Sequence, residues 1–108
     1  MDDETITRGT GNVFADLRYA DADERQTKLR LADAINGVVA RRRLTQAATA
    51  EKLNVNQPKV SALANYKLDG FSVERLMIFL TALDQDVEIL IHNKPCSRPA
   101  GRISVVAA

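Results

Sequence analysis

A short polar run over residues 56–61, NQPKVS, carries side chains that can hydrogen-bond the edges of DNA bases. The amide of Gln57 matches the donor and acceptor pair of adenine, N6 and N7, and the ammonium of Lys59 suits guanine O6 and N7 or a phosphate. The hydroxyl of Ser61 can serve either base edge or backbone. These three residues are the predicted base-reading residues, and the chemistry they offer is non-covalent recognition.

The elements that would present these residues are two short helices with a tight turn between them, predicted over residues 44–63. Thr45 has the side-chain oxygen that an N-cap needs, and it precedes a helix over about residues 46–53. Asn56 can cap the next helix, and Pro58 lies in its first turn, where a missing N–H leaves no unmet partner. This arrangement is a helix-turn-helix, whose second helix enters the major groove with its first turns against the bases.

A second set of residues is expected to contact the sugar-phosphate backbone. Residues 41–67 carry six basic residues against Glu51 alone, and the N-terminus of the first short helix adds a positive pole that suits phosphate. The arginines at 41–43 also have a purely structural explanation, because they lie at the negative end of a helix dipole. The predicted backbone-contacting residues are Arg43, Thr45, Gln46, Asn56, Asn65 and Lys67.

Two further helices are predicted around this unit. Asp21 or Asp23 can cap a long helix that runs to about Arg43, and Ser72 can cap a helix over about residues 73–83. The apolar residues of both segments recur at helical spacing, which marks a buried stripe on each. The predicted fold class is therefore mainly α, with four or five helices.

Alternating residues over 86–92 predict a short C-terminal β-strand. One strand cannot satisfy its own edges, so it would pair with residues 12–17, predicted as a short N-terminal strand or a docking peptide, or with its copy in a dimer. The chain is thus divided into a flexible acidic N-terminal segment (1–20), a helix-turn-helix domain ending in the strand (21–92) and a C-terminal tail (93–108).

The composition argues against an enzyme, a membrane protein and a disulfide-stabilised protein. Cys96 is the single cysteine and His92 the single histidine, so no internal disulfide, metal site or cofactor is predicted. No apolar run approaches the roughly 18 residues that span a bilayer, and the acidic start does not resemble a secretory signal. We therefore expect a cytoplasmic, non-enzymatic protein that makes no membrane contact.

Several motifs resemble those of a known family. Thr45-Gln46, Ala50, Leu53-x-Val55 and QPKVS at 57–61 are similar to the helix-turn-helix of the xenobiotic-response-element (XRE, Cro/C1-type) regulators. More narrowly, GNVFADL at 11–17, QPKVS, FSVERL at 71–76 and LxxDVEI at 83–89 look like a HigA-like antitoxin subgroup. Together the match covers roughly residues 11–92. Asn54 and Tyr66 stand where this family often has Gly.

The resemblance implies a lambda-repressor-like fold and a homodimeric repressor that binds a palindromic operator in its own promoter. It also implies a RelE-like mRNA-cleaving toxin as partner. Residues 1–24 carry seven acidic residues against two basic ones, a charge that complements a basic RNA-binding surface, and Val13, Phe14 and Leu17 are the predicted toxin contacts. Two alternatives stay open: a stand-alone Cro/C1-type regulator, and an interaction module that has lost DNA binding.

Overall fold

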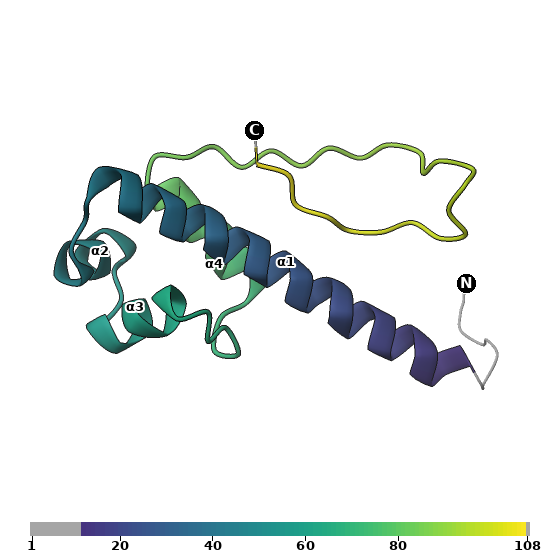
Figure 1. Cartoon of the computed structure of the whole chain (residues 1–108), viewed down its shortest axis with the longest axis horizontal. Helices are drawn as coiled ribbons and strands as arrows, with labels where there is room; N and C mark the ends of the chain where they lie inside the picture. Colours follow the sequence, from purple (N-terminus) through teal and green to yellow (C-terminus); the bar gives the residue numbers. More distant parts are fainter. Residues whose placement is uncertain (1–11, 108) are drawn as a thin grey trace.

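Within residues 12–107 the chain folds as four helices followed by an extended C-terminal segment (Figure 1). The computed structural model describes the backbone of residues 12–107 and the side chains of residues 22–107. The helices are α1 (Asn12–Arg42), α2 (Gln46–Leu53), α3 (Gln57–Ala64) and α4 (Val73–Ala82). The predicted mainly α fold class is confirmed, and of the four or five helices that were predicted, the described residues contain four.

The first helix is longer than the sequence indicated. It begins at Asn12 rather than at Asp21 or Asp23, so the short strand predicted for residues 12–17 is wrong. No proline or glycine interrupts residues 12–36, and alanines are frequent in the first part of this stretch. A capping side chain therefore does not start a helix when the residues before it can continue the helix.

This longer helix crosses the predicted end of the flexible N-terminal segment. Residues 12–20 form the first turns of α1, whereas residues 1–11 lie outside the described residues. The side chains of Val13, Phe14 and Leu17, predicted as toxin contacts, also lie outside the described set. The division of the chain at residues 20 and 92 stays a prediction.

One aliphatic core joins the four helices. α1 packs mainly against α4, and α2 packs mainly against α3. Two aromatic rings complete the core, with the rings of Phe71 and Phe79 edge to face at a centroid distance of 5.9 Å. The core cluster consists of Leu31, Ala32, Ile35, Val38, Leu53, Leu63, Leu68, Phe71, Leu76, Phe79, Leu80 and Leu83.

All four helices end in the same backbone motif, and none of them uses glycine for it. The residue past each last turn has a positive φ: 54° at Arg43, 58° at Asn54, 59° at Tyr66 and 65° at Asp84. The next N–H donates to the carbonyl five residues earlier, with N···O distances of 2.8–3.0 Å, which is the Schellman arrangement. A left-handed backbone costs a residue with a Cβ roughly 1–2 kcal/mol, a cost that glycine would avoid.

The C-terminal arm (residues 86–107) is extended but is not a β-strand. Within residues 12–107 no strand occurs, so the strand predicted over 86–92 is wrong. A β-strand needs backbone hydrogen bonds to a neighbouring strand. In the described chain, no backbone hydrogen bond joins residues 86–92 to another segment. The arm runs out over α1 and turns back (Figure 1), and Val87 and Val105 pack against the core.

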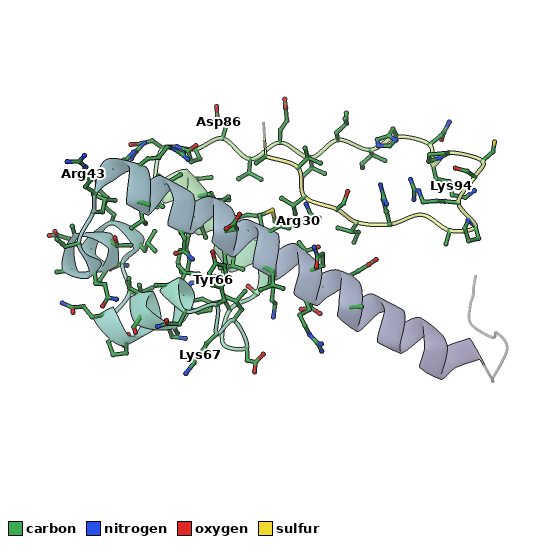
Figure 2. All side chains as sticks on the ribbon, in the orientation of Figure 1. Arg30, Arg43, Tyr66, Lys67, Asp86 and Lys94 are labelled. Atoms are coloured by element: carbon green, nitrogen blue, oxygen red, sulfur yellow. The ribbon has the colours of Figure 1, made fainter. Side chains whose placement is uncertain are left out.

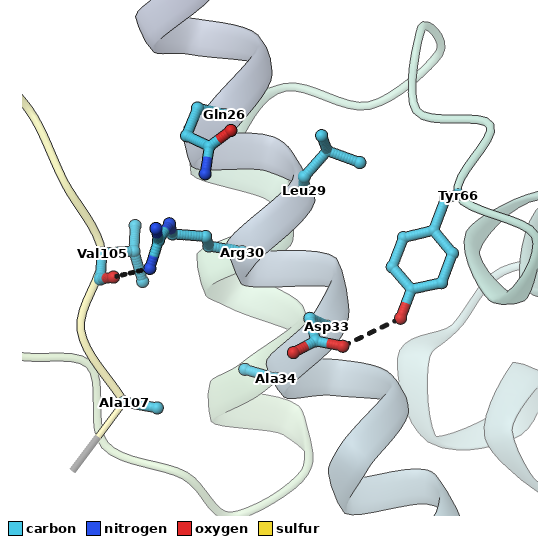
Figure 3. A pocket seen from close by; sticks show the side chains of 8 residues that line it. All are labelled: Gln26, Leu29, Arg30, Asp33, Ala34, Tyr66, Val105 and Ala107. Carbon is cyan, nitrogen blue, oxygen red and sulfur yellow. Dashed lines mark hydrogen bonds between the residues drawn. The ribbon is translucent and has the colours of Figure 1, made fainter.

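Two side-chain contacts from one face of α1 hold this arm and the loop after α3. The Arg30 Nη1 donates to the Val105 carbonyl at 3.4 Å, and the Tyr66 hydroxyl donates to Asp33 Oδ1 at 3.0 Å. Figure 3 shows both contacts on the rim of a hollow of about 420 Å³ that also includes Leu29. The segment that leaves the third helix is therefore anchored to the first.

Candidate nucleic-acid interface

The helix-turn-helix predicted over residues 44–63 is present as α2, a turn and α3. The Thr45 Oγ1 accepts a hydrogen bond from the Ala48 N–H at 3.0 Å, which confirms the first predicted cap. The Asn56 Oδ1 accepts from the Lys59 N–H, also at 3.0 Å, which confirms the second. Because these bonds satisfy N–H groups of each first turn, both helices begin at defined residues.

The third helix is held against the first by a polar contact that the sequence did not single out. The half-buried Asn36 donates from Nδ2 to the Leu63 carbonyl at 3.2 Å, next to the buried side chains of Val60 and Leu63. The same carbonyl accepts from the Tyr66 N–H at 3.1 Å, so the Asn36 amide adds a second hydrogen bond that joins α1 to the end of α3. The only signal in the sequence was an amide within the apolar stripe of the first helix.

The three predicted base-reading residues have different surroundings. Gln57 is exposed at the start of α3, whereas Ser61 is half-buried. Lys59 is exposed, but its Nζ lies 5.1 Å from the centroid of the Phe71 ring, a cation–π contact. The structure therefore brings Gln57 and Lys59 to one exposed helix start and leaves Ser61 less accessible.

The predicted backbone-contacting residues lie at three places. Thr45, Gln46 and Asn56 are exposed at the N-termini of α2 and α3. Figure 2 shows Arg43 at the end of α1 and Lys67 beyond α3, so these two cations lie on either side of the helix-turn-helix. Their separation suits contacts to different phosphates rather than to one.

Two of the polar residues near this surface are occupied within the fold. The Asn65 Nδ2 donates to the Ser61 carbonyl at 2.9 Å, so one amide hydrogen of this predicted backbone contact is already used. The Arg42 Nη1 lies 3.4 Å from Asp84 Oδ2, an exposed ion pair that offsets one charge of the basic block. This pair depends on the packing of α1 against α4 and had no local sequence signal.

The described residues offer no alternative site for metal chemistry. In that part of the chain no three His, Cys, Asp or Glu side chains are grouped to hold a metal ion. His92 and Cys96 are both exposed on the C-terminal arm. Among the helices of residues 12–107, none combines the length and hydropathy that a membrane span requires.

Comparisons with known proteins agree with the helix-turn-helix geometry. A helix-turn-helix domain family matches residues 13–92. A solved structure named as an XRE-family transcriptional regulator is 73% identical to this chain, covers 82% of it and 99% of its own length, and superposes with a TM-score of 0.78. No match was found among curated proteins. The chain therefore belongs to the XRE family of helix-turn-helix DNA-binding transcriptional regulators and is not an enzyme.

Proposed function

We propose that this regulator is a sequence-specific repressor that reads bases with Gln57 and Lys59, with Ser61 as a weaker third contact. The exposed first turn of α3, capped by Asn56 and backed by buried Val60, is the observation that carries the proposal. A fixed helix start with an amide and an ammonium on its surface is what major-groove recognition needs.

Lys59 would have to leave the Phe71 ring to reach DNA. An exposed cation–π contact is worth about 0.5–1 kcal/mol, whereas a hydrogen bond to a charged group contributes about 1.5–3 kcal/mol. A phosphate or guanine contact therefore outweighs the contact that Lys59 makes without DNA. The contact with the Phe71 ring restricts the conformations of the Lys59 side chain before DNA binds.

The backbone contacts are proposed to come from both sides of this helix. Arg43, Thr45 and Gln46 would hold the phosphates before α2, and Asn56, Asn65 and Lys67 those beside α3. The free-energy contribution of such contacts comes largely from counterion release, so affinity should fall steeply as salt rises. These contacts orient α3 but carry no base information themselves.

Two copies are proposed to bind a palindrome in the promoter of the protein's own gene, in the cytoplasm. Each recognition helix would then occupy one half-site, with the half-sites about one DNA turn apart. Single α3 surfaces offer only two or three base contacts, which supports a dimer as the binding form.

The direct test is fluorescence anisotropy with the upstream DNA of the gene and a scrambled duplex, at two salt concentrations. We expect tighter binding to the upstream DNA and a steep loss of affinity with salt. The variant Gln26→Ala, an exposed Gln on α1 beside the arm, is the matched control for Gln57→Ala and should bind as the wild type does. No binding of either duplex at low salt would favour an interaction module that has lost DNA binding.

We further propose that the repressor is the antitoxin of a RelE-like mRNA-cleaving toxin. Support comes from the acidic segment 1–24, which has seven acidic residues against two basic ones and contains the apolar Val13, Phe14 and Leu17. A toxin that binds RNA has a basic surface, which such a segment complements. The alternative is a stand-alone regulator in which this segment only completes the fold.

Co-expression distinguishes these two roles. The product of the adjacent reading frame should arrest growth when expressed alone and be neutralised by the full chain. Removal of residues 1–20 should abolish neutralisation while operator binding is kept. A neighbouring gene without a small basic product, or full neutralisation by the shortened chain, would contradict the antitoxin role.

A further inference from the structure

The first limb of the C-terminal arm, residues 86–94, is an extended segment that lacks a backbone partner. In the arm as described, the backbone–backbone hydrogen bond that occurs is the local turn from the Arg98 N–H to the Pro95 carbonyl, at 3.2 Å. The returning limb, residues 101–107, is not bonded to it. Unpaired N–H and C=O groups along an extended apolar segment form a template for another strand.

One face of this limb continues the core of the domain and then loses its cover. Leu83 is fully buried and Val87 half-buried. Ile89 and Ile91 follow on the same side of an extended chain, because side chains alternate with a period of two, yet they are 73% and 90% exposed. The apolar face therefore extends beyond what the single chain can cover.

We propose that this limb pairs antiparallel with the same limb of a second copy, with Leu90 on the two-fold axis. The proposal rests on the proposed function, because it gives the repressor dimer its contact surface. An antiparallel pairing is also the arrangement that makes a two-fold interface self-complementary.

The charges of the limb agree with this register. With Leu90 opposite the partner's Leu90, Asp86 lies opposite the partner's Lys94, which is a pair of opposite charge, and Glu88 lies opposite the polar ring of the partner's His92. Cross-strand pairs of opposite charge stabilise a sheet. Figure 2 shows Asp86 at the base of the limb and Lys94 near its far end, so the base of one copy meets the end of the other.

The apolar residues agree with the same register. Ile89 then lies opposite the partner's Ile91 on the face that continues the core, and this happens twice in the dimer. If the axis passed through Ile89 instead, Glu88 would face the partner's Leu90, an acidic residue against an apolar one. Leu90 is 84% exposed in the single chain. In the pairing it lies at the centre of the opposite face of the two-stranded sheet, where it contacts the partner's Leu90.

Disulfide trapping tests the pairing and its register together. In full-length protein carrying Cys96→Ser, the variant Leu90→Cys places two sulfurs across the axis, where directly opposite Cα atoms are about 4.5–5.5 Å apart. A disulfide tolerates about 4.4–6.8 Å. The matched controls are Ile89→Cys, whose two copies would be diagonal neighbours about 7–8 Å apart, and Glu88→Cys, whose copies would be further apart.

We expect mild oxidation to convert Leu90→Cys largely to a covalent dimer, at least tenfold faster than either control. Faster cross-linking of Ile89→Cys would overturn the register. Equal rates for all three variants, or no cross-linking of any, would overturn the pairing.

A charge exchange gives a second measurement without a disulfide. Asp86→Lys alone should raise the dimer dissociation constant about threefold to tenfold, because like charges then meet twice in each dimer. Adding Lys94→Asp should restore it. A double variant no tighter than Asp86→Lys would contradict the assignment of this pair.

Operator binding measured on the same samples keeps the proposal distinct from the proposed function. A cross-linked Leu90→Cys dimer that binds no DNA would leave the pairing supported and the repressor role contradicted. A non-cross-linking protein that still binds its operator as a dimer would support the repressor role and overturn the limb pairing.

Discussion

The helix-turn-helix and the C-terminal arm both have exposed surfaces, but they differ in how their backbone groups are satisfied. In residues 44–67 the helix starts are closed by Thr45 and Asn56, and the helix ends by bonds to carbonyls five residues earlier. In residues 86–94 no comparable bond is found in the described structure.

This difference separates two kinds of recognition surface. A segment whose backbone is satisfied locally can present side chains to a ligand without changing its own conformation. A segment with unsatisfied backbone groups instead offers those groups to a partner, and its order depends on that partner. Changes in the first region should alter stability, and changes in the second should alter association.

The largest expected contrast is between two leucine truncations. Leu63→Ala removes a side chain that is 2% exposed and should lower the free energy of unfolding by about 3 kcal/mol. Leu90→Ala removes one that is 84% exposed and should change it by less than about 0.5 kcal/mol. Urea unfolding at protein concentrations below the dimer dissociation constant measures both. Similar losses would contradict the separation of the two regions.

A smaller contrast is expected between two asparagines. Asn56→Ala deletes the cap of α3 and should cost about 1 kcal/mol of unfolding free energy. Asn93→Ala, at an exposed arm position, serves as the control and should be close to neutral. Thermal unfolding followed by circular dichroism compares them directly, and an Asn56→Ala transition at the wild-type temperature would show that the cap is dispensable.

The smallest expected effect has opposite signs for the same substitution at two nearby arginines. Arg43→Gly should stabilise the fold by about 0.5–1 kcal/mol, because Arg43 has a φ of 54° that glycine adopts without strain. Arg41→Gly lies in the last turn of α1 and should destabilise the fold by up to about 1 kcal/mol. Urea unfolding of both variants and the wild type measures whether the free energy of unfolding rises for Arg43→Gly and falls for Arg41→Gly.

Operator affinity adds a second readout for Arg43→Gly. Loss of a proposed phosphate contact should weaken binding even though the folded state is more stable. A variant that is both more stable and equally tight on DNA would remove Arg43 from the interface.

The sequence predicted the locally determined parts of this structure well. Thr45, Asn56 and Ser72 are N-caps as expected, and α2 has its predicted bounds. Each of these features depends on hydrogen bonds within a few residues, so the local sequence contains the necessary information.

Features that depend on distant residues were predicted poorly. The strand at 86–92 was expected from its alternation, but a strand also needs a partner that the alternation does not supply. The contacts of Lys59 with Phe71 and of Asn36 with Leu63 join residues from different elements. Their chemistry was visible in the sequence, but their partners became identifiable only in the fold.

The measurement that tests the central account most directly compares two variants on two duplexes. Gln57→Ala and Lys67→Ala are each titrated against the operator and a scrambled duplex by fluorescence anisotropy. We expect Gln57→Ala to lose about 1–3 kcal/mol on the operator and little on the scrambled duplex, whereas Lys67→Ala should weaken both about equally. Equal losses of Gln57→Ala on both duplexes would contradict base reading by the first turn of α3.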